Sequence, residues 1–281
     1  MTDTSMRQPS FLKSAAGENI AWLNDGAAAD AGEKCGFFWL GGFMSDMRGT
    51  KAEALGHLAA RRERSAVRFD YSGHGASSGS LSEGTIGKWL DEAYMVFSDI
   101  AKGPRVLIGS SMGGWIALLL YRRLMREAPQ QAQRIAGLVL LAPAADMTEE
   151  LMWNQFPQQA REALMRDGRI EIPSEYGDTP YVITRELIEE GRHHLLLKDG
   201  LDVTCPVRIL QGDADPDVPW RHALKTYEAI RGEDVTFTLI KGADHRLSDP
   251  NALMLLGETV ESLCVRADAR RQNRAQAQRM N

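Results

Sequence analysis

Residues 106–120 constrain the fold more than any other stretch of this sequence. A short apolar run after Pro104 predicts a buried strand, and the Ala- and Leu-rich run at the other end predicts a helix. Between them lies Gly109-Ser110-Ser111-Met112-Gly113, a G-x-S-x-G frame centred on Ser111. A sharp strand-to-helix turn needs glycines beside the serine because the backbone is crowded there. The segment therefore predicts an exposed, strained serine between a strand and a helix.

Apolar runs alternate with helical patterns over most of the chain. A hairpin is expected near residues 11–14 and 19–23, and further strands at 36–40, 66–69, 135–141, 206–210 and 235–240. Helical spacing covers residues 50–63, 86–100, 220–230 and 252–265. With the strand before Ser111, this order predicts an α/β fold with a mostly parallel, eight-stranded sheet and helices on both faces.

The alternation stops after Pro143, at the end of the sixth expected strand. Residues 146–200 are acidic, Met-rich and helical in pattern, and prolines at 157, 173 and 180 interrupt them. We expect one core formed by residues 10–145 and 201–265, with residues 146–200 inserted as a helical cap. Residues 266–281 are rich in Arg, Gln and Ala and nearly free of apolar side chains, which predicts a fraying helix or a disordered tail.

Composition excludes several classes of protein. The net charge of −5 provides no basic surface for nucleic acid, and no apolar run is long enough for membrane insertion. Cys35, Cys205 and Cys264 lack metal-ligand spacing, and the pair His193 and His194 lacks a carboxylate partner at such spacing. We therefore expect no metal and no cofactor. The absence of a targeting pattern predicts a cytoplasmic, bacterial protein, and the oligomeric state stays open.

A serine that attacks an acyl carbon needs a base, and the base needs a carboxylate to orient it. His245 lies in a turn directly after the last expected strand, from which its imidazole can reach Ser111. His222 is the alternative, but it lies just inside a helix and is expected to point along the surface. We expect no catalytic role for His74, in the Gly/Ser-rich loop after residue 70.

The acidic turn after the seventh strand provides the candidate carboxylates. Asp215 lies at its centre beside Pro216 and is the preferred candidate, with Asp213 as an alternative. Asp217 is expected to cap the next helix, and Asp146, after the sixth strand, is a further alternative for the acid.

Two backbone N–H groups are also needed to stabilise an oxyanion. Met112, which follows Ser111, is expected to provide one, and Phe43, which follows the third strand and Gly42, is expected to provide the other. Five apolar side chains are candidates for lining an acyl groove: Met44, Met147, Met152, Trp153 and Phe156. Ordinary packing of the cap against the sheet is an equally good explanation for each of them.

With these residues the chain resembles the α/β-hydrolase family, and within it the mitochondrial palmitoyl-protein thioesterases that also hydrolyse acyl glucuronides, with their bacterial relatives. The resemblance spans residues 36–250 and rests on Gly42-Phe43, Met47-Arg-Gly-Thr-Lys-Ala52, Arg68-Phe-Asp-Tyr-Ser-Gly73, Ile86-Gly-Lys-Trp89, Gly109-Ser-Ser-Met-Gly-Gly-Trp115, Ile172-Pro-Ser-Glu-Tyr176, Val218-Pro-Trp220 and Asp244-His-Arg246. It implies a Ser111–Asp215–His245 triad. One departure is Gln211, where many relatives have His.

The sequence therefore predicts a serine hydrolase that cleaves carboxylic esters or thioesters through an acyl-enzyme. Its substrate would be an acylated protein or a small-molecule ester, and palmitoyl-protein thioesterase and broad carboxylesterase both fit. A non-catalytic ligand-binding protein of the same fold is the alternative from a different class. Dehalogenase chemistry is disfavoured because the elbow carries Ser rather than Asp.

Overall fold

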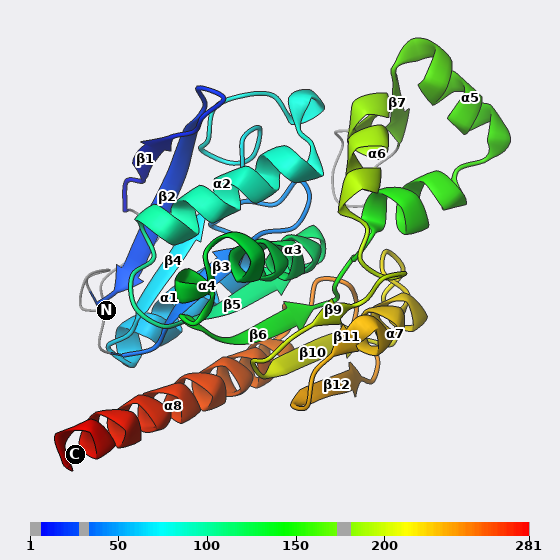
Figure 1. Ribbon diagram of the computed structural model, residues 1–281. Coiled ribbons are helices and arrows are strands. Elements are labelled where there is room, and N and C mark those ends of the chain that lie inside the picture. The colour runs from blue at the N-terminus through cyan, green and yellow to red at the C-terminus, as the bar shows by residue number, and fades with distance from the viewer. Residues whose placement is uncertain (1–6, 28–33, 173–180, 281) are drawn as a thin grey trace.

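A computed structural model describes residues 7–27, 34–172 and 181–280 of the chain. Its centre is an eight-stranded sheet in the order β1-β2-β4-β3-β5-β6-β10-β12 (Figure 1). The strands β1 and β2 pair antiparallel at one edge, β2 pairs antiparallel with β4, and all the others are parallel. The predicted mostly parallel sheet is thus confirmed. Its strands are β1 (Ser10–Lys13), β2 (Asn19–Gly26), β3 (Gly36–Leu40), β4 (Ser65–Phe69), β5 (Arg105–Ser110), β6 (Ile135–Leu141), β10 (Val207–Gly212) and β12 (Val235–Ile240).

Helices cover both faces because the central strands are apolar on both sides. In β3, Phe37 and Trp39 pack on one face, while Phe38 and Leu40 pack on the other. The first face is covered by α1 (Thr50–Arg61) and α8 (Pro250–Met280). The second is covered by α2 (Ile86–Asp99), α3 (Met112–Glu127) and α7 (Trp220–Ala229), with the short α4 (Pro129–Ala132) after α3. The short η2 (Leu81–Glu83) precedes α2, and β11 (Ile230–Arg231) follows α7.

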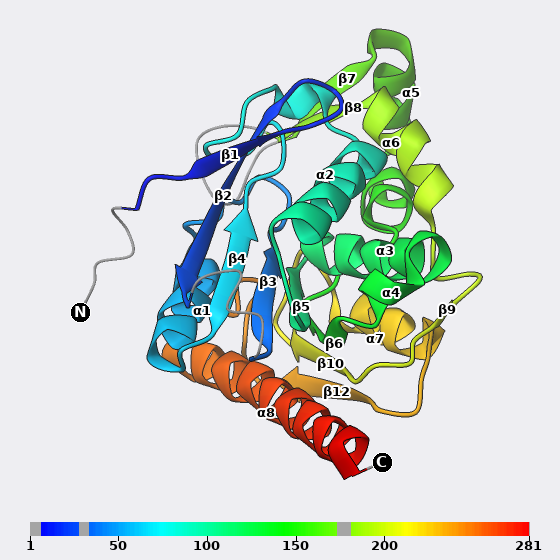
Figure 2. The ribbon, with the colours of Figure 1, turned by 60° about the vertical axis from the view of Figure 1, so that its left-hand side comes forward.

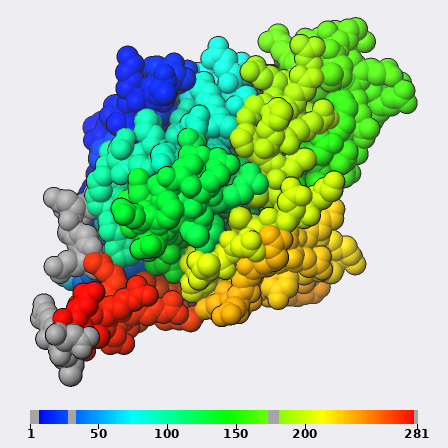
Figure 3. Space-filling model, in the orientation of Figure 1, coloured from blue at the N-terminus to red at the C-terminus, as the bar shows by residue number. Residues whose placement is uncertain are grey.

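The chain between β6 and β10 forms an insertion at one end of the molecule (Figure 3). Its core is a small apolar cluster of Leu164, Ile183 and Ile188. The insertion is not wholly helical, because β7 and β8 pair antiparallel as a hairpin, with Ile172 opposite Tyr181. The elements are η3 (Thr148–Met152), η4 (Trp153–Gln155), α5 (Gln158–Asp167), β7 (Arg169–Ile172), β8 (Tyr181–Thr184), α6 (Arg185–Gly191), η5 (Arg192–His194) and β9 (Leu201–Asp202). The segment 173–176, which belongs to the family resemblance, and the prolines at 173 and 180 lie outside the described residues.

The last helix is longer than the apolar pattern predicts. We expected a helix over residues 252–265 and a frayed or disordered tail, whereas α8 continues to Met280. Arg, Gln and Ala are good helix formers, and neither Gly nor Pro follows residue 257. The intrinsic helix propensity of these residues therefore extends α8 beyond the part that packs on the sheet. In Figures 1 and 2 these last turns project beyond the sheet. Within the described ranges, no helix has the length and apolar content needed to cross a membrane.

Candidate active site

Ser111 lies at the turn between β5 and α3, where the chain reverses sharply. Its backbone has φ 54° and ψ −120°, a strained conformation for a residue with a side chain. The Ser111 N–H donates to Leu141 O at 2.8 Å, and the Ser111 C=O accepts from Gly114 N at 2.9 Å and Ala144 N at 3.1 Å. Neighbouring backbone from β6 therefore holds the turn in this conformation.

Two glycines make this turn possible because the backbone passes too close for a side chain. A Cβ at Gly109 would lie 2.2 Å from Gly113 O, and a Cβ at Gly113 would lie 2.1 Å from Leu40 O. Both distances are far below van der Waals contact with backbone atoms that cannot move aside. The G-x-S-x-G frame is thus required by the close approach of β3, β5 and α3.

His245 and Asp215 meet at the carboxyl ends of β10 and β12. His245 Nδ1 lies 2.8 Å from Asp215 Oδ2, which also accepts from Gln211 Nε2 at 3.0 Å. Asp215 Oδ1 accepts from the N–H groups of Asp217 at 3.0 Å and Val218 at 2.8 Å. The carboxylate is fully buried, and these four donors fix its orientation. With its proton on Nδ1, His245 has Nε2 available to accept a proton.

Gln211 has a role that sequence reasoning did not assign. Its Nε2 donates to Asp215 Oδ2 and to the C=O of Val218 at 3.0 Å. The residue therefore links the carboxylate to the turn that carries it. In the sequence, Gln211 was noted only as a departure from the family resemblance, which did not indicate which atoms its side chain would contact.

Two of the other candidates in this region differ from their predictions. His222 is buried rather than on the surface, because its Nε2 lies 2.8 Å from Ala145 O, and burial lowers its pKa. Asp217 does not cap α7, whose N-cap residue is Pro219 with no side-chain hydrogen bond. Asp213 pairs with Lys241 at 2.7 Å, whereas the carboxylate that binds His245 is that of Asp215.

Asp146, the remaining alternative for the acid, holds the insertion in place. Its carboxylate accepts from Leu196 N at 2.7 Å and Leu197 N at 2.9 Å, and burial raises its pKa. His74 is also buried, with its ring edge-on to Trp89 at 5.2 Å between centroids. Neither side chain bonds to His245.

The loop after β3 approaches the serine closely. A Cβ at Gly42 would lie 3.3 Å from Ser110 O and 3.4 Å from Ser111 Cβ. The next residue, Phe43, is half-buried, and its ring stacks on Tyr181 at 6.1 Å between centroids. Met112 is fully buried at the first position of α3. The expected oxyanion donors therefore belong to the two segments adjoining Ser111, and their role stays a prediction.

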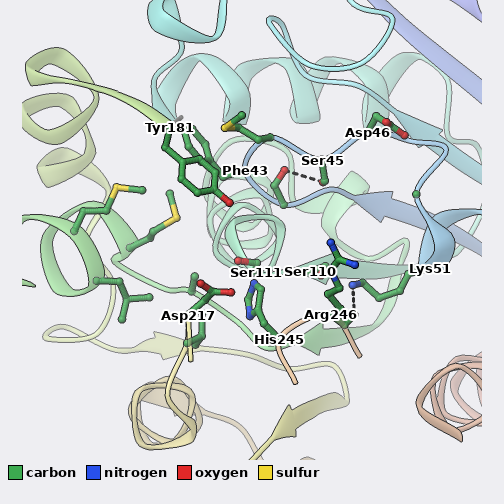
Figure 4. A pocket seen from close by; sticks show the side chains of 18 of the residues that line it. Phe43, Ser45, Asp46, Lys51, Ser110, Ser111, Tyr181, Asp217, His245 and Arg246 are labelled. Carbon is green, nitrogen blue, oxygen red and sulfur yellow. Dashed lines mark hydrogen bonds between the residues drawn. The ribbon is translucent and has the colours of Figure 1, made fainter. Parts of the chain in front are cut away.

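A cavity of about 820 Å³ contains both Ser111 and His245. We call its apolar lining residues, most of which come from the insertion, the apolar arm of the cavity, and the polar lining residues near the start of α1 and after His245 its polar arm. Figure 4 shows Phe43 and Tyr181 on one side of Ser111 and His245, and Lys51 and Arg246 on the other. The apolar arm is lined by Phe43, Met44, Met147, Leu151, Met152, Phe156, Ile172, Tyr181 and Ile183. The polar arm is lined by Ser45, Asp46, Thr50, Lys51, Arg246 and Ser248.

Four of the five apolar candidates for an acyl groove thus line the apolar arm, and Trp153 does not. The Trp153 indole packs within the insertion, where the guanidinium groups of Arg161 and Arg192 lie 5.4 and 5.0 Å from its ring centre. Tyr181 was missed because its contact with Phe43 depends on how the insertion folds over the sheet, and no local pattern marks that contact.

Lys51 was missed as a pocket residue, although it belongs to the Gly-Thr-Lys segment of the family resemblance. Its Nζ donates to the C=O of Arg246, the residue after His245. Burial lowers the pKa of the Lys51 ammonium to about 8, against the opposing attraction of Asp244 and Asp215. This side chain therefore joins the first turn of α1 to the loop that presents His245.

Among the described residues, the one group with three potential metal ligands is Asp215, Asp217 and His245. The four donors on the Asp215 carboxylate occupy the positions that a cation would need, so this arrangement fits a hydrogen-bonded pair better than a metal site. The expectation that His194 lacks a carboxylate partner is wrong, because His194 Nε2 lies 2.6 Å from Glu190 Oε1.

The order and direction of the strands agree with comparison to known proteins. The chain belongs to the alpha/beta hydrolase family, whose model matches residues 36–254. A curated relative, the mitochondrial palmitoyl-protein thioesterase ABHD10 of Homo sapiens, is 34% identical over 233 residues, which are 83% of this chain and 74% of the relative.

Two solved structures extend the similarity over nearly the whole fold. A crystal structure of a protein from Agrobacterium vitis S4 is 41% identical, with a TM-score of 0.85, and the match covers 92% of this chain and 100% of the other. Alpha/beta hydrolase domain-containing protein 10 from mouse is 32% identical, with a TM-score of 0.78, and that match covers 92% of this chain and 98% of the other.

Proposed function

We propose that this chain is a serine hydrolase that cleaves acyl thioesters or oxygen esters through an acyl-enzyme. Ser111 is the nucleophile, His245 the base and Asp215 the carboxylate that orients the base. The observation that supports this most strongly is the strained Ser111, with φ 54°, in the same pocket as His245, whose Nδ1 lies 2.8 Å from Asp215.

The reaction proceeds in two halves. His245 takes the proton of Ser111 Oγ as Oγ bonds to the acyl carbon, and the N–H groups of Phe43 and Met112 stabilise the oxyanion. The bond to the departing sulfur or oxygen then breaks, and His245 gives its proton to the leaving group. Water, deprotonated by His245, attacks the acyl-serine, and the intermediate releases a carboxylic acid and free Ser111.

The preferred substrate in this proposal is a long-chain acyl thioester, including an acylated protein. The apolar arm of the cavity supports an acyl chain, and the ABHD10 relatives are named palmitoyl-protein thioesterases. A broad carboxylesterase is the second candidate, since the polar arm suits the alcohol of a small ester. A thiol leaves with little protonation because its pKa is about 8.5, so a site able to expel an alkoxide also expels a thiolate.

The test is hydrolysis of matched thioesters and oxygen esters from acetyl to palmitoyl, with Ser111→Ala as the blank. A long-chain thioester preference that disappears in Ser111→Ala supports the thioesterase. A preference for short esters supports the carboxylesterase. Turnover by the wild type that does not exceed that of Ser111→Ala on every substrate contradicts the hydrolase proposal and favours a ligand-binding protein.

A cytoplasmic location stays a prediction. The curated relatives, by contrast, are named as mitochondrial proteins.

A further inference from the structure

The loop between β3 and α1 forms much of the cavity wall. Its residues Gly42, Phe43, Met44, Ser45 and Asp46 all line the cavity. This short segment includes Phe43, whose N–H is a proposed oxyanion donor, so its position relative to Ser111 matters for the reaction. What holds the loop lies outside the cavity.

The anchor of the loop is Met47. Its side chain is 1% exposed and packs with Ala21 and Leu23 of β2. The Met47 N–H donates to Asp70 Oδ1 at 2.6 Å, and the Met47 C=O accepts from Arg68 Nη1 at 2.6 Å. Both backbone groups of one residue are therefore bound by charged side chains.

Those two side chains come from the end of β4 and are themselves held in place. Arg68 is 1% exposed and pairs with the fully buried Asp25 through an Nε to Oδ2 contact of 2.6 Å. The second oxygen of Asp70 accepts from Ala76 N at 2.8 Å. We call Asp25, Arg68 and Asp70 the Met47 clamp.

The loop has little freedom between its two fixed ends. At one end Gly42 lies against Ser111, and at the other the clamp holds Met47. Between them Ser45 folds back onto Gly42 O through its N–H at 3.1 Å and its Oγ at 2.8 Å, and Met44 has φ 58°. A shift of Met47 would therefore pass to the peptide that bears the Phe43 N–H.

We propose that Asp70 and Arg68 are positioning residues for this active site: through Met47 they hold the Phe43 N–H in place to receive the oxyanion. This inference rests on the proposed function. It gives a role to the Arg68-Phe-Asp70 segment, which the triad and the oxyanion donors leave unused.

Asp70 binds its two backbone N–H partners best in its charged form. Burial raises the pKa of Asp70 to about 6, and Asp46 adds to this rise, while the N–H groups of Ala76 and Met47 and the Arg48 guanidinium oppose it. The charged carboxylate is thus destabilising relative to water, yet only this form offers an acceptor oxygen to each of its two N–H partners. Protonation turns one oxygen into a hydroxyl that faces a donor.

Asp70→Asn tests the inference with nearly the same shape. The amide keeps one oxygen for one N–H and presents its NH₂ to the other, so the clamp loosens without creating a cavity. We expect kcat on the best substrate to fall by about tenfold or more, with KM within about twofold of the wild type, because misplacement affects the transition state more than binding. We expect the urea midpoint to be unchanged or higher, because a buried charge has been removed.

Asp268→Asn is the matched control. Asp268 also accepts a backbone N–H, from Cys35 at 2.7 Å, and pairs with Arg64, but it lies at the opposite end of β3 from the cavity. Its kcat is expected to equal that of the wild type. A folded Asp70→Asn with kcat within about twofold of the wild type overturns the inference, and so does an equal loss in Asp268→Asn.

The pH profile of the wild type provides a measurement that does not depend on how Asp70→Asn folds. The fall of kcat/KM at low pH should require two protonations rather than one, and the protonation of Asp70, whose pKa burial raises to about 6, should account for about tenfold of the loss; a profile described by a single protonation overturns the inference. Near-UV circular dichroism at each pH verifies that the enzyme stays folded. Activity that survives in Ser111→Ala contradicts the proposed function itself, whereas an inactive Ser111→Ala beside a fully active Asp70→Asn contradicts only the Met47 clamp.

Discussion

Replacing Asp215 by Asn removes one acceptor from a carboxylate that uses both of its oxygens. Oδ1 binds the backbone N–H groups of Asp217 and Val218 at 3.0 and 2.8 Å. Oδ2 binds Gln211 Nε2 at 3.0 Å and His245 Nδ1 at 2.8 Å. The backbone N–H groups of Asp217 and Val218 can bind only to an oxygen, so we expect the single Asn side-chain oxygen to stay with them. The Asn NH₂ then faces His245.

The consequence is a change of tautomer at His245. A donor opposite Nδ1 moves the imidazole proton to Nε2, and a protonated Nε2 cannot accept the proton of Ser111. In serine hydrolases this error lowers kcat by about 10⁴, or about 5.4 kcal/mol in the activation free energy. We expect a loss of that size in Asp215→Asn, with little change in KM.

The assay is kcat on the best substrate of the ester and thioester series, measured on protein shown to be folded by thermal unfolding. Asp213→Asn is the control, because Asp213 shares the same turn but binds Lys241, and its kcat should match the wild type. A folded Asp215→Asn that keeps kcat within about tenfold of the wild type would refute the reasoning, as would a larger loss in Asp146→Asn.

Three further predictions follow from packing and charge. Gly113→Ala places a methyl 2.1 Å from Leu40 O and should lower the free energy of unfolding by about 2 kcal/mol or more; a urea midpoint equal to that of the wild type would contradict the crowding at the elbow. Met152→Ala should raise KM for palmitoyl substrates by about tenfold and leave acetyl substrates unchanged, whereas Trp153→Ala, outside the cavity, should show no such chain-length dependence. Because the pKa of Lys51 falls to about 8, its buried ammonium destabilises the folded chain until it loses its proton. The wild type should therefore gain about 2 kcal/mol relative to Lys51→Met between about pH 7 and pH 9.5, and parallel stability curves would show that the ammonium is not buried.

The residues proposed for catalysis could be found from the sequence because their positions follow from local patterns. Parallel strands buried on both faces appear as unbroken apolar runs, so the ends of β5, β10 and β12 are readable. Ser111, Asp215 and His245 each follow one of these ends, and the carboxyl ends of parallel strands meet at one edge of the sheet. Chain order alone therefore predicted the meeting of Asp215 and His245.

The features that were missed depend on contacts between distant segments. The hairpin of β7 and β8 is short and only half-buried, so its alternation is lost among helical neighbours. His222 is buried because α7 turns this residue toward the loop at Ala145. That contact depends on the loop and cannot be predicted from the residue pattern of α7. Trp153 and Met152 are adjacent in sequence, yet only Met152 reaches the cavity. No periodicity distinguishes such neighbours.

Asp146 has a consequence for how proteins of this kind diversify. It lies just after β6, and its two hydrogen bonds reach Leu196 and Leu197, close to where the chain returns toward β10. The intervening chain is thus closed into a loop whose two ends are fastened at one carboxylate. The length and sequence of such a segment can change while the strands that precede Ser111 and His245 keep their register in the sheet. A graft of residues 147–195 from a relative would have to keep the two bonds to Asp146 and also the contacts of Glu190 with Gly87 and of Glu150 with Lys225, which join the insertion to the core elsewhere.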